Sequence, residues 1–330
     1  MQEQRATTAL ERAINSQPEQ LERLLTHDEP RLHEAAERLH RCRRLWLVGT
    51  GTSQHAAELG AAMLQEAGRG AVAVPSMHFV TWPPFVTPQD GVILISHNAG
   101  AETAYVAAGF RQAVNAGIRV VAITRQNGEL PDSIETVPKE ESETYTVSYS
   151  GALIILARIA AALGSDTAAA DTLAKVPGAV RAAIADPGIQ RVPRPRRLLL
   201  LYGAGPASVT AREGALKLRE ASRTLCEGYD AEYLLHGSAV PLTAEDHMVA
   251  LSPPDPDGFV SAVARAAEAE GIGVSTVVEP ADLPPLLAQI PLTARLQLLA
   301  LRFAEDKGEN PDRVITGAWG DPALWSIGSP

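Results

Sequence analysis

The chain carries the stretch Leu45-Trp-Leu-Val-Gly-Thr-Gly-Thr-Ser53 and, further along, Leu198-Leu-Leu-Leu-Tyr-Gly-Ala-Gly-Pro-Ala-Ser208. Each joins a short apolar run to a glycine-rich turn with a hydroxyl residue, and a helical pattern follows. This order is typical of the strand, turn and helix that open an α/β unit. The device recurs after 154 residues, from Gly49 to Gly203. We therefore predict an internal duplication, with two similar lobes packed as one body.

Short apolar runs alternate with helical periodicity over the rest of the chain. Further strands are predicted at residues 71–74, 92–95, 120–123, 248–251 and 274–278, and helices over the first forty residues, 104–116 and 151–163. Such alternation indicates βαβ units and parallel sheets covered on both faces. The expected fold is α/β, with two tandem lobes that are each a flavodoxin-like three-layer sandwich of helices around a parallel sheet.

Three regions are expected along the chain. Residues 1–185 hold N-terminal helices and the first lobe, and residues 197–330 hold the second lobe and a C-terminal tail. Between them, residues 186–196 contain three prolines, and we interpret them as a solvated linker rather than an anion site. Residues 307–330 predict an extended tail. Its Trp319 and Trp325 are expected to pack on the body, either closing over a site or anchoring the tail.

The composition excludes several classes of function. The 330 residues have 29 basic and 39 acidic side chains, a net charge of −10, which argues against a broad grip on nucleic acid or anionic lipid. Two cysteines form neither a disulfide framework nor a zinc site. No secretory signal is expected from the first residues, and the most apolar stretch, 151–164, is too short to span a membrane. We expect a cytoplasmic protein without a metal, a nucleic-acid partner or a membrane.

Three polar segments are candidates for a binding site. The turn at residues 49–53 aims backbone N–H groups and hydroxyls at one point, as anion sites do, although a tight turn without a ligand has the same pattern. Gln54 replaces the third glycine of a dinucleotide fingerprint, and no P-loop occurs. Residues 96–103 follow the next strand and should meet the first turn at one sheet edge. There, His97 is interpreted as an exposed or capping residue. In the third segment, 143–150, Ser148 or Ser150 can serve as a helix N-cap.

The second lobe contributes acid–base candidates. Glu213, Lys217 and Glu220 lie at positions i, i+4 and i+7 and so share one helix face. Spacing alone favours a surface ladder of ion pairs. His236 follows on a segment that ends in Gly237. A carboxylate and a histidine beside a sugar can move protons between carbon and oxygen.

Together these features resemble the sugar isomerase (SIS) domain family, and specifically the isomerase half of glucosamine-6-phosphate synthase, the glutamine–fructose-6-phosphate aminotransferase. The resemblance rests on three blocks: Leu47-Val-Gly-Thr-Gly-Thr-Ser53, Ile95-Ser96 with Glu102-Thr103, and Glu213-Gly-Ala-Leu-Lys-Leu-Arg-Glu220 continuing to His236-Gly237. Their order and spacing match over residues 35–318, and the third block is the specific one.

The resemblance implies two tandem SIS lobes that bind a sugar phosphate. The implied binding residues are Gly51, Thr52, Ser53, Ser96, Asn98, Thr103 and Ser148, with Glu143 sensing the sugar. Glu220 becomes the base that moves a proton between C1 and C2 through an enediol, with Lys217 beside it. His236 assists ring opening and reaches into the site of a partner in a homodimer.

Three departures from the family pattern shape the expected activity. Asn98, Ala99 and Ala101 interrupt the family's Ser-x-Ser-Gly-x-Thr turn, and Thr316 stands where the family has a Schiff-base lysine. No glutaminase domain is expected, and residue 2 is glutamine rather than a catalytic cysteine. Ammonia, rather than glutamine, would then serve any amination.

The function predicted from the sequence is the interconversion of amino-sugar and ketose 6-phosphates, of the glucosamine 6-phosphate/fructose 6-phosphate type, by enediol proton transfer without a cofactor. Two alternatives stay open. One is a non-catalytic sugar-phosphate sensor, and the other is an aldose–ketose isomerase or deglycase for another phosphorylated sugar.

Overall fold

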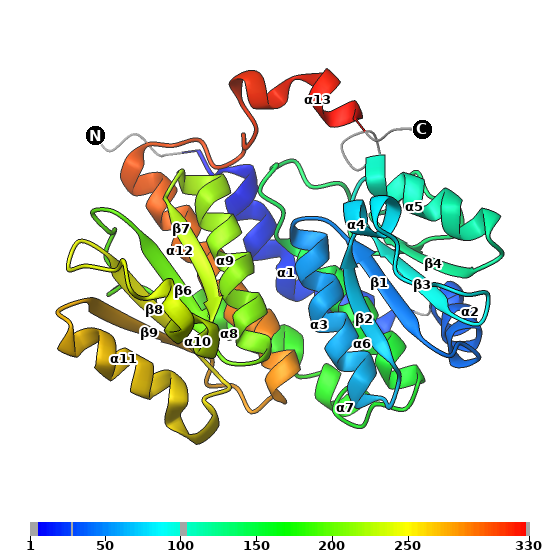
Figure 1. The fold of residues 1–330 in the computed structure, drawn as a ribbon, viewed down its shortest axis with the longest axis horizontal. Coiled ribbons are helices and arrows are strands. Elements are labelled where there is room, and N and C mark those ends of the chain that lie inside the picture. Colours follow the sequence, from blue (N-terminus) through cyan, green and yellow to red (C-terminus); the bar gives the residue numbers. More distant parts are fainter. Residues whose placement is uncertain (1–5, 28, 100–103, 328–330) are drawn as a thin grey trace.

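The computed structural model describes residues 6–27, 29–99 and 104–327, and in them two parallel sheets lie side by side (Figure 1). The first sheet has the order β2-β1-β3-β4-β5 and the second the order β7-β6-β8-β9. The first contains β1 (Leu45–Gly49), β2 (Ala71–Pro75), β3 (Gly91–Ile95), β4 (Arg119–Thr124) and β5 (Ile134–Glu135). The second contains β6 (Leu199–Gly203), β7 (Cys226–Asp230), β8 (His247–Ser252) and β9 (Gly273–Val278).

Helices cover both faces of each sheet. They are α1 (Ala9–Thr26), α2 (Pro30–His40), α3 (Thr52–Glu66), α4 (Ser76–Thr81), α5 (Ala104–Asn115), α6 (Val147–Ala162), α7 (Ala170–Leu173), α8 (Val176–Ala185), α9 (Pro206–Ser222), α10 (Ala231–Tyr233), α11 (Phe259–Ala269), α12 (Pro285–Lys307) and α13 (Pro322–Ser326). Alternation along the strands decides the layers: Leu45 and Leu47 pack with α3 and α6, whereas Trp46 and Val48 pack with α4 and α5. In the second lobe Leu199 and Leu201 face α9 and α12. The predicted three-layer α/β fold with tandem lobes is confirmed.

The two glycine turns have the same backbone conformation, as a duplication requires. Gly51 precedes α3 with φ 54° and ψ −129°, and Gly205 precedes α9 with φ 54° and ψ −123°. A Cβ on Gly49 would lie 2.5 Å from the carbonyl oxygen of Ser53, and one on Gly203 would lie 2.6 Å from Cβ of Ala207. Glycine is therefore needed at matching positions in both turns.

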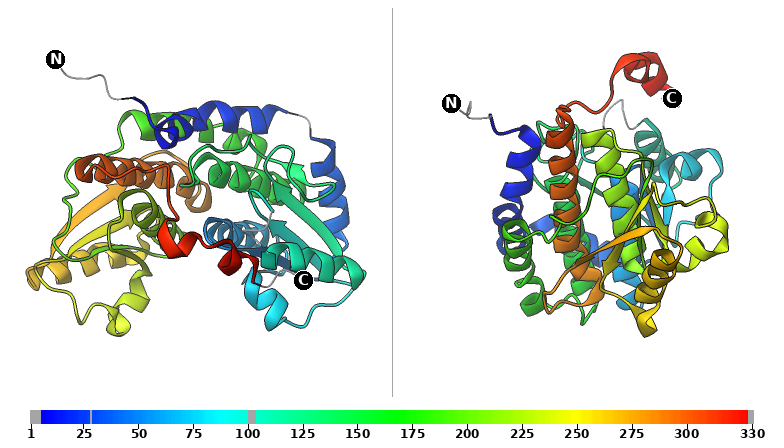
Figure 2. Two further views of the ribbon diagram at one scale, coloured as in Figure 1. Left: turned by 90° about the horizontal axis from the view of Figure 1, so that it is seen from above. Right: turned by 90° about the vertical axis from the view of Figure 1, so that its left-hand side faces the viewer.

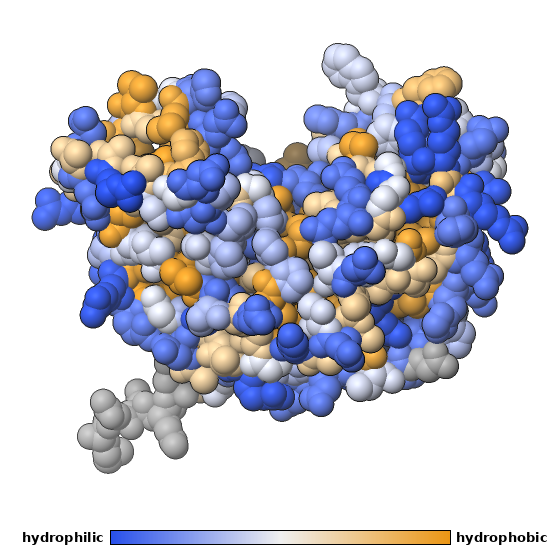
Figure 3. Space-filling view, turned by 90° about the horizontal axis from the view of Figure 1, so that it is seen from below, coloured by the Kyte–Doolittle hydropathy of each residue, from blue (hydrophilic) through white to orange (hydrophobic). Residues whose placement is uncertain are grey.

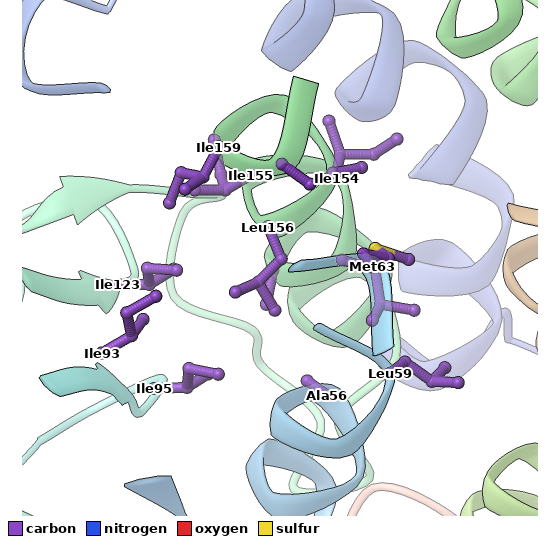
Figure 4. Packing of buried hydrophobic residues seen from close by; sticks show 14 of the residues in the cluster. Ala56, Leu59, Met63, Ile93, Ile95, Ile123, Ile154, Ile155, Leu156 and Ile159 are labelled. Carbon is purple, nitrogen blue, oxygen red and sulfur yellow. The ribbon is translucent and has the colours of Figure 1, made fainter. Parts of the chain in front are cut away.

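The first lobe's core fixes where its site can form. Aliphatic side chains of β3, β4, α3 and α6 pack together, among them Ile93, Ile123, Leu59 and Leu156 (Figure 4). A Cβ on Gly60 would lie 2.7 Å from Cδ1 of Leu156, so glycine lets α3 lie close to α6. This packing holds the first turns of α3 and α6 at the same end of the sheet.

Residues 186–196, predicted to be a solvated linker, connect α8 to β6, and most of them are exposed. The carbonyls of Ile189 and Val192 accept hydrogen bonds from Arg302, the carbonyl of Asp186 accepts one from Arg295, and the Ile189 and Val192 side chains are buried. The segment is thus packed against α12, because arginines of that helix satisfy its backbone.

The tail, expected to be extended, contains two short helical segments. After α12 it crosses the top of the molecule from the second lobe to the first, and it contains the turn η4 (Gly317–Gly320) and α13 (Figures 1 and 2). Within the described ranges, no helix has both the length and the apolar character needed to cross a membrane.

Candidate functional site

A cavity of about 560 Å³ opens at the carboxyl end of the first sheet. Its lining comes from the β1–α3 turn, the residues after β3, the start of α6, the end of α9 and the tail. The predicted site residues that line it are Gly51, Thr52, Ser53, Ser96, Asn98, Glu143, Ser148 and Glu220. The structure therefore brings together residues up to 169 positions apart, from Gly51 to Glu220.

Two of the predicted site residues that the structure describes do not line this cavity. Lys217 is fully buried beneath it, next to Glu220. His236 lies exposed on the one-turn helix η2 (Leu234–Ser238), away from the lining residues. Thr103 lies outside the described residues.

The start of α3 is the part of the cavity best suited to an anion. Its first turn has no acidic residue, and Gly51 at its N-cap supplies no side-chain bond, so the positive end of the helix faces the cavity uncapped by a side chain. Thr50, Thr52 and Ser53 add hydroxyls beside it. A phosphate fits such a site without a basic side chain.

The start of α6 is already occupied by a carboxylate. Glu140 is buried and accepts hydrogen bonds from the backbone N–H groups of Thr146 at 3.1 Å and Ser148 at 2.8 Å. The N-cap position belongs to Thr146, so neither Ser148 nor Ser150 has the N-cap role that the sequence suggested. Sequence reasoning missed Glu140, because this residue lies in the loop before α6 and belongs to no helical or strand periodicity.

A row of charged side chains, mostly buried, runs along α9 to the cavity. Nζ of Lys217 lies 2.6 Å from Oε2 of Glu220 and 3.6 Å from Oε1 of Glu213. Both Lys217 and Glu213 are 0% exposed, so the expected surface ladder is wrong. Helices α3 and α12 and strand β7 pack around this face of α9 and exclude water from it.

Burial and charge act in opposite directions on these groups. Burial raises the pKa of Glu220, and the adjacent negative charge of Glu213 adds to this against the attraction of Lys217. Burial also opposes the ionisation of Glu213, but Lys217, His55 and Thr52 together hold its pKa below the usual range. The pKa of Lys217 is raised, because the two glutamates outweigh burial. Lys217 therefore stays cationic, and Glu220 is the more basic carboxylate.

Glu213 also contacts the first lobe. The hydroxyl of Thr52 donates to Oε1 of Glu213 at 3.2 Å, and Nδ1 of His55 lies 2.6 Å from Oε2. Thr52, expected to bind phosphate with its hydroxyl, thus uses that hydroxyl on Glu213. His55 was missed by sequence reasoning, although it lies three residues after Thr52 and hence on the same helix face.

His97 is a neutral side chain at the cavity wall. Burial first, and then the charges of Arg125 and Lys139, lower its pKa to about 4. Its Nε2 accepts the backbone N–H of Glu140 at 3.2 Å, which assigns the proton to Nδ1. The ring lies 5.0 Å from that of Tyr145. His97, expected to be an exposed or capping residue, is therefore half-buried, and its ring nitrogen accepts a backbone hydrogen bond.

The tail closes one side of the cavity. Oε2 of Glu143 accepts the backbone N–H groups of Val314 at 2.7 Å and Ile315 at 3.3 Å, and these residues and Trp325 line the cavity. Glu143, given a sugar-sensing role by the resemblance, thus holds the tail. Trp325 lines the site, whereas Trp319 is 74% exposed.

No lysine of the tail takes the Schiff-base position in the part of the chain that is described. Thr316 is exposed. Nζ of Lys307 binds the carbonyls of Ser222 and Arg223 and so caps the C-terminal end of α9. The described lining residues include neither lysine nor arginine.

Comparison with known proteins agrees with this architecture. Residues 38–135, which lie in the first lobe, match the SIS domain family. It resembles the C-terminal, isomerase part of glutamine–fructose-6-phosphate aminotransferase. The enzyme of that name from Pyrococcus horikoshii is 27% identical over 330 residues, which cover 91% of this chain and 55% of that protein. This chain thus spans about half the length of the curated relatives that it matches.

Solved structures share the whole fold. The tagatose-6-phosphate ketose/aldose isomerase of Escherichia coli superposes with a TM-score of 0.80 at 19% identity, covering 94% of this chain and 96% of that one. The C-terminal domain of glucosamine-fructose-6-phosphate aminotransferase from Francisella tularensis gives 0.76 at 19% identity, covering 95% and 100%. At these identities the likeness concerns the fold.

Proposed function

We propose that this chain is a phosphosugar isomerase-type enzyme that moves a proton between C1 and C2 of an amino-sugar or ketose 6-phosphate. One observation carries the proposal: a buried Lys217 contacts Glu220 at the wall of a cavity that the uncapped start of α3 also lines. A base and an anion site then face one sugar-sized space. The activities named for the relatives point in the same direction.

The residues divide the work by their chemistry. The α3 turn would hold the phosphate through backbone N–H groups and hydroxyls. Glu220, whose pKa is raised by burial, would take the proton from one carbon and return it to the next as the enediol collapses. The ammonium of Lys217 would keep this carboxylate in place. The shift is redox-neutral, so it needs no nicotinamide, and ammonia would serve any amination.

Proton NMR in D₂O tests the proposal. Fructose 6-phosphate and glucosamine 6-phosphate are incubated separately with the chain, with and without ammonium, and deuterium entry at C1 or C2 is followed. We expect exchange that Glu220→Gln abolishes while sugar-phosphate binding persists. Glu37→Gln, at an exposed glutamate of α2, is the matched control and should leave exchange unchanged.

The exposed Thr316 and the absence of lysine among the described lining residues favour the sensor as a second candidate. Saturable binding of either sugar phosphate without exchange would support it and contradict an enzyme. Exchange with another phosphorylated ketose, but with neither of these two, would support an isomerase or deglycase for that sugar.

We also propose that the chain forms a homodimer with shared sites. Each lobe projects on the same side of the molecule, and apolar residues are exposed on the projections (Figures 2 and 3). They are Trp82 and Phe85 beyond α4, and Tyr233, Leu235 and Val240 around η2. A second copy placed against this side would cover both groups and bring the exposed His236 to a neighbouring cavity.

Mixing two inactive variants tests the sharing. Co-expressed Glu220→Gln and His236→Ala chains form mixed dimers in which one of the two sites has both residues if His236 acts across the interface. Activity should then return to a fraction of the wild-type value. A fully active monomer in sedimentation, or no recovery in verified mixed dimers, would contradict shared sites.

A further inference from the structure

The carboxylate of Glu213 joins the two lobes. It comes from α9 of the second lobe and receives Thr52 at 3.2 Å and His55 at 2.6 Å, both from α3 of the first lobe. The two helices lie side by side at the centre of the molecule (Figure 1). A second contact between them, the ion pair of Arg212 and Glu58, lies next to this one but is partly exposed.

The contact between Glu213 and α3 surrounds a charged carboxylate that water does not reach. The side chain of Glu213 is 0% exposed and that of His55 is 15% exposed. A buried carboxylate in such a place depends on its donors and counter-ions, because the protein replaces its hydration. The other side of the same carboxylate faces Nζ of Lys217, which in turn contacts Glu220. The position of Glu213 therefore decides how the lysine is shared between the two glutamates.

We propose that His55 is a positioning residue for the proposed isomerisation. By binding Glu213 from the first lobe, it fixes the Glu213–Lys217–Glu220 chain that presents the base to the cavity. Thr52 ties the same carboxylate to the turn expected to hold the phosphate. Binding at the turn and alignment of the base are thereby coupled across the lobe boundary. This inference rests on the proposed function.

His55 acts through Glu213 and not on the sugar. Its neighbours Thr52, Ser53 and Ala56 line the cavity, but His55 is not among the lining residues. Its ring instead faces α9. The Arg212–Glu58 pair joins the same two helices without contact to Glu213. Removing this pair therefore measures the effect of losing a purely structural contact between the lobes.

The sign of the expected pH effect follows from the titratable groups around Glu213. From α9 these are Lys217 and Glu220, from α3 His55, and from α6 and the residues before it Tyr149 and Glu140. Without His55, Lys217 still keeps Glu213 ionised, but the carboxylate then draws the ammonium away from Glu220. The pKa of Glu220 rises, so the base becomes active only at higher pH.

The experiment compares His55→Ala, His55→Asn and Glu58→Gln by the rate and pH profile of the D₂O exchange. We expect His55→Ala to lower kcat at least tenfold with KM within about twofold, and to move the acid limb to higher pH. The asparagine amide can occupy the place of Nδ1, so His55→Asn should recover most of kcat. Glu58→Gln should leave kcat, KM and the profile unchanged.

Each outcome decides the matter. Wild-type exchange with an unchanged His55→Ala variant would overturn the inference but leave the proposed function standing. Equal losses of kcat in His55→Ala and Glu58→Gln without a pH shift would show that His55 only stabilises the packing between the lobes, and would overturn the inference. No exchange by the wild-type chain with any sugar phosphate would refute both proposals. If His55→Ala does not fold, His55→Gln, whose amide is placed at Nε2, takes its place beside His55→Asn.

Discussion

Replacing Lys217 by methionine should destabilise the protein strongly, and more at high pH than at low pH. The change keeps a long apolar side chain but removes the ammonium that lies 3.6 Å from Glu213 and 2.6 Å from Glu220. Glu220 is 18% exposed and can keep some hydration, whereas Glu213 is 0% exposed and cannot. The buried charge of Glu213 therefore dominates the cost.

The magnitude follows from what remains around Glu213. Removing one partner of a buried ion pair costs about 3–5 kcal/mol. Thr52 and His55 still donate to the carboxylate, and hydrogen bonds to charged groups contribute about 1.5–3 kcal/mol each. We therefore expect Lys217→Met to lower the free energy of unfolding by about 3 kcal/mol at pH 8, the low end of the range for a broken buried ion pair. This is a large share of the stability of an ordinary domain, about 5–15 kcal/mol.

The pH dependence has opposite signs in the two proteins. In the wild type the pKa of Glu213 is lowered, so its contribution to stability is present above the unfolded-state pKa and is lost as the pH falls through the folded-state pKa. In Lys217→Met burial prevails, and the folded-state pKa rises above the unfolded-state value. The variant then loses stability as the pH rises, and its deficit should shrink between pH 8 and pH 5.

Urea unfolding followed by circular dichroism at pH 8 and pH 5 measures both effects. Lys175→Met, at an exposed lysine, is the control and should stay within about 0.5 kcal/mol of the wild type. Glu213→Gln combined with Lys217→Met should recover part of the loss, since the fully buried charge is removed and only the partly exposed Glu220 is left without its lysine. A deficit below about 1 kcal/mol at pH 8, or one that does not shrink at pH 5, would refute this account of the buried pair.

Three further outcomes are expected. Glu143→Ala removes the acceptor of two backbone N–H groups of the tail, so limited proteolysis should cut residues 309–327 faster than in the wild type, while Glu141→Ala, an exposed control bound to Arg12, should not change the rate. Gly214→Ala places a Cβ 2.4 Å from Cδ1 of Leu296 and should lower the free energy of unfolding by about 1–3 kcal/mol, whereas Gly178→Ala, with open space at this position, should leave it unchanged or raise it by about 0.4–1 kcal/mol. The pKa of His97, about 4, predicts an imidazole NMR signal that does not titrate between pH 8 and pH 5.5; a midpoint near 6.5 would contradict its burial.

The fold was largely predictable because its strongest signals are local. Central strands such as β1 and β6 are buried on both faces and read as continuous apolar runs. The edge strand β7, Cys226-Glu-Gly-Tyr-Asp230, has no such run and was not predicted, since most of it is half-exposed. The contacts of the linker with α12 could not be predicted, because its backbone partners, Arg295 and Arg302, are about a hundred residues away.

The site was predictable only where topology alone brings residues together. Loops that end neighbouring parallel strands must meet, and so Ser53 and Ser96 were expected at one cavity. The burial of Glu213 could not be foreseen, since the spacing of Glu213, Lys217 and Glu220 is the same in an exposed ladder. What distinguishes them is contact with Thr52 and His55, 161 and 158 residues earlier.

The duplicated turns account for how the two lobes came to contribute different parts. The first turn leaves the start of α3 open to the cavity. In the second, Pro206 opens α9, and the residues of that turn line no part of this cavity. Helix α9 contributes its last turns instead, where the negative end of the helix dipole disfavours ionised Glu220 and so adds to the effect of burial. In the proposed function, one copy of the unit thus supplies the positive end of a helix for an anion, and the other supplies the negative end for a base.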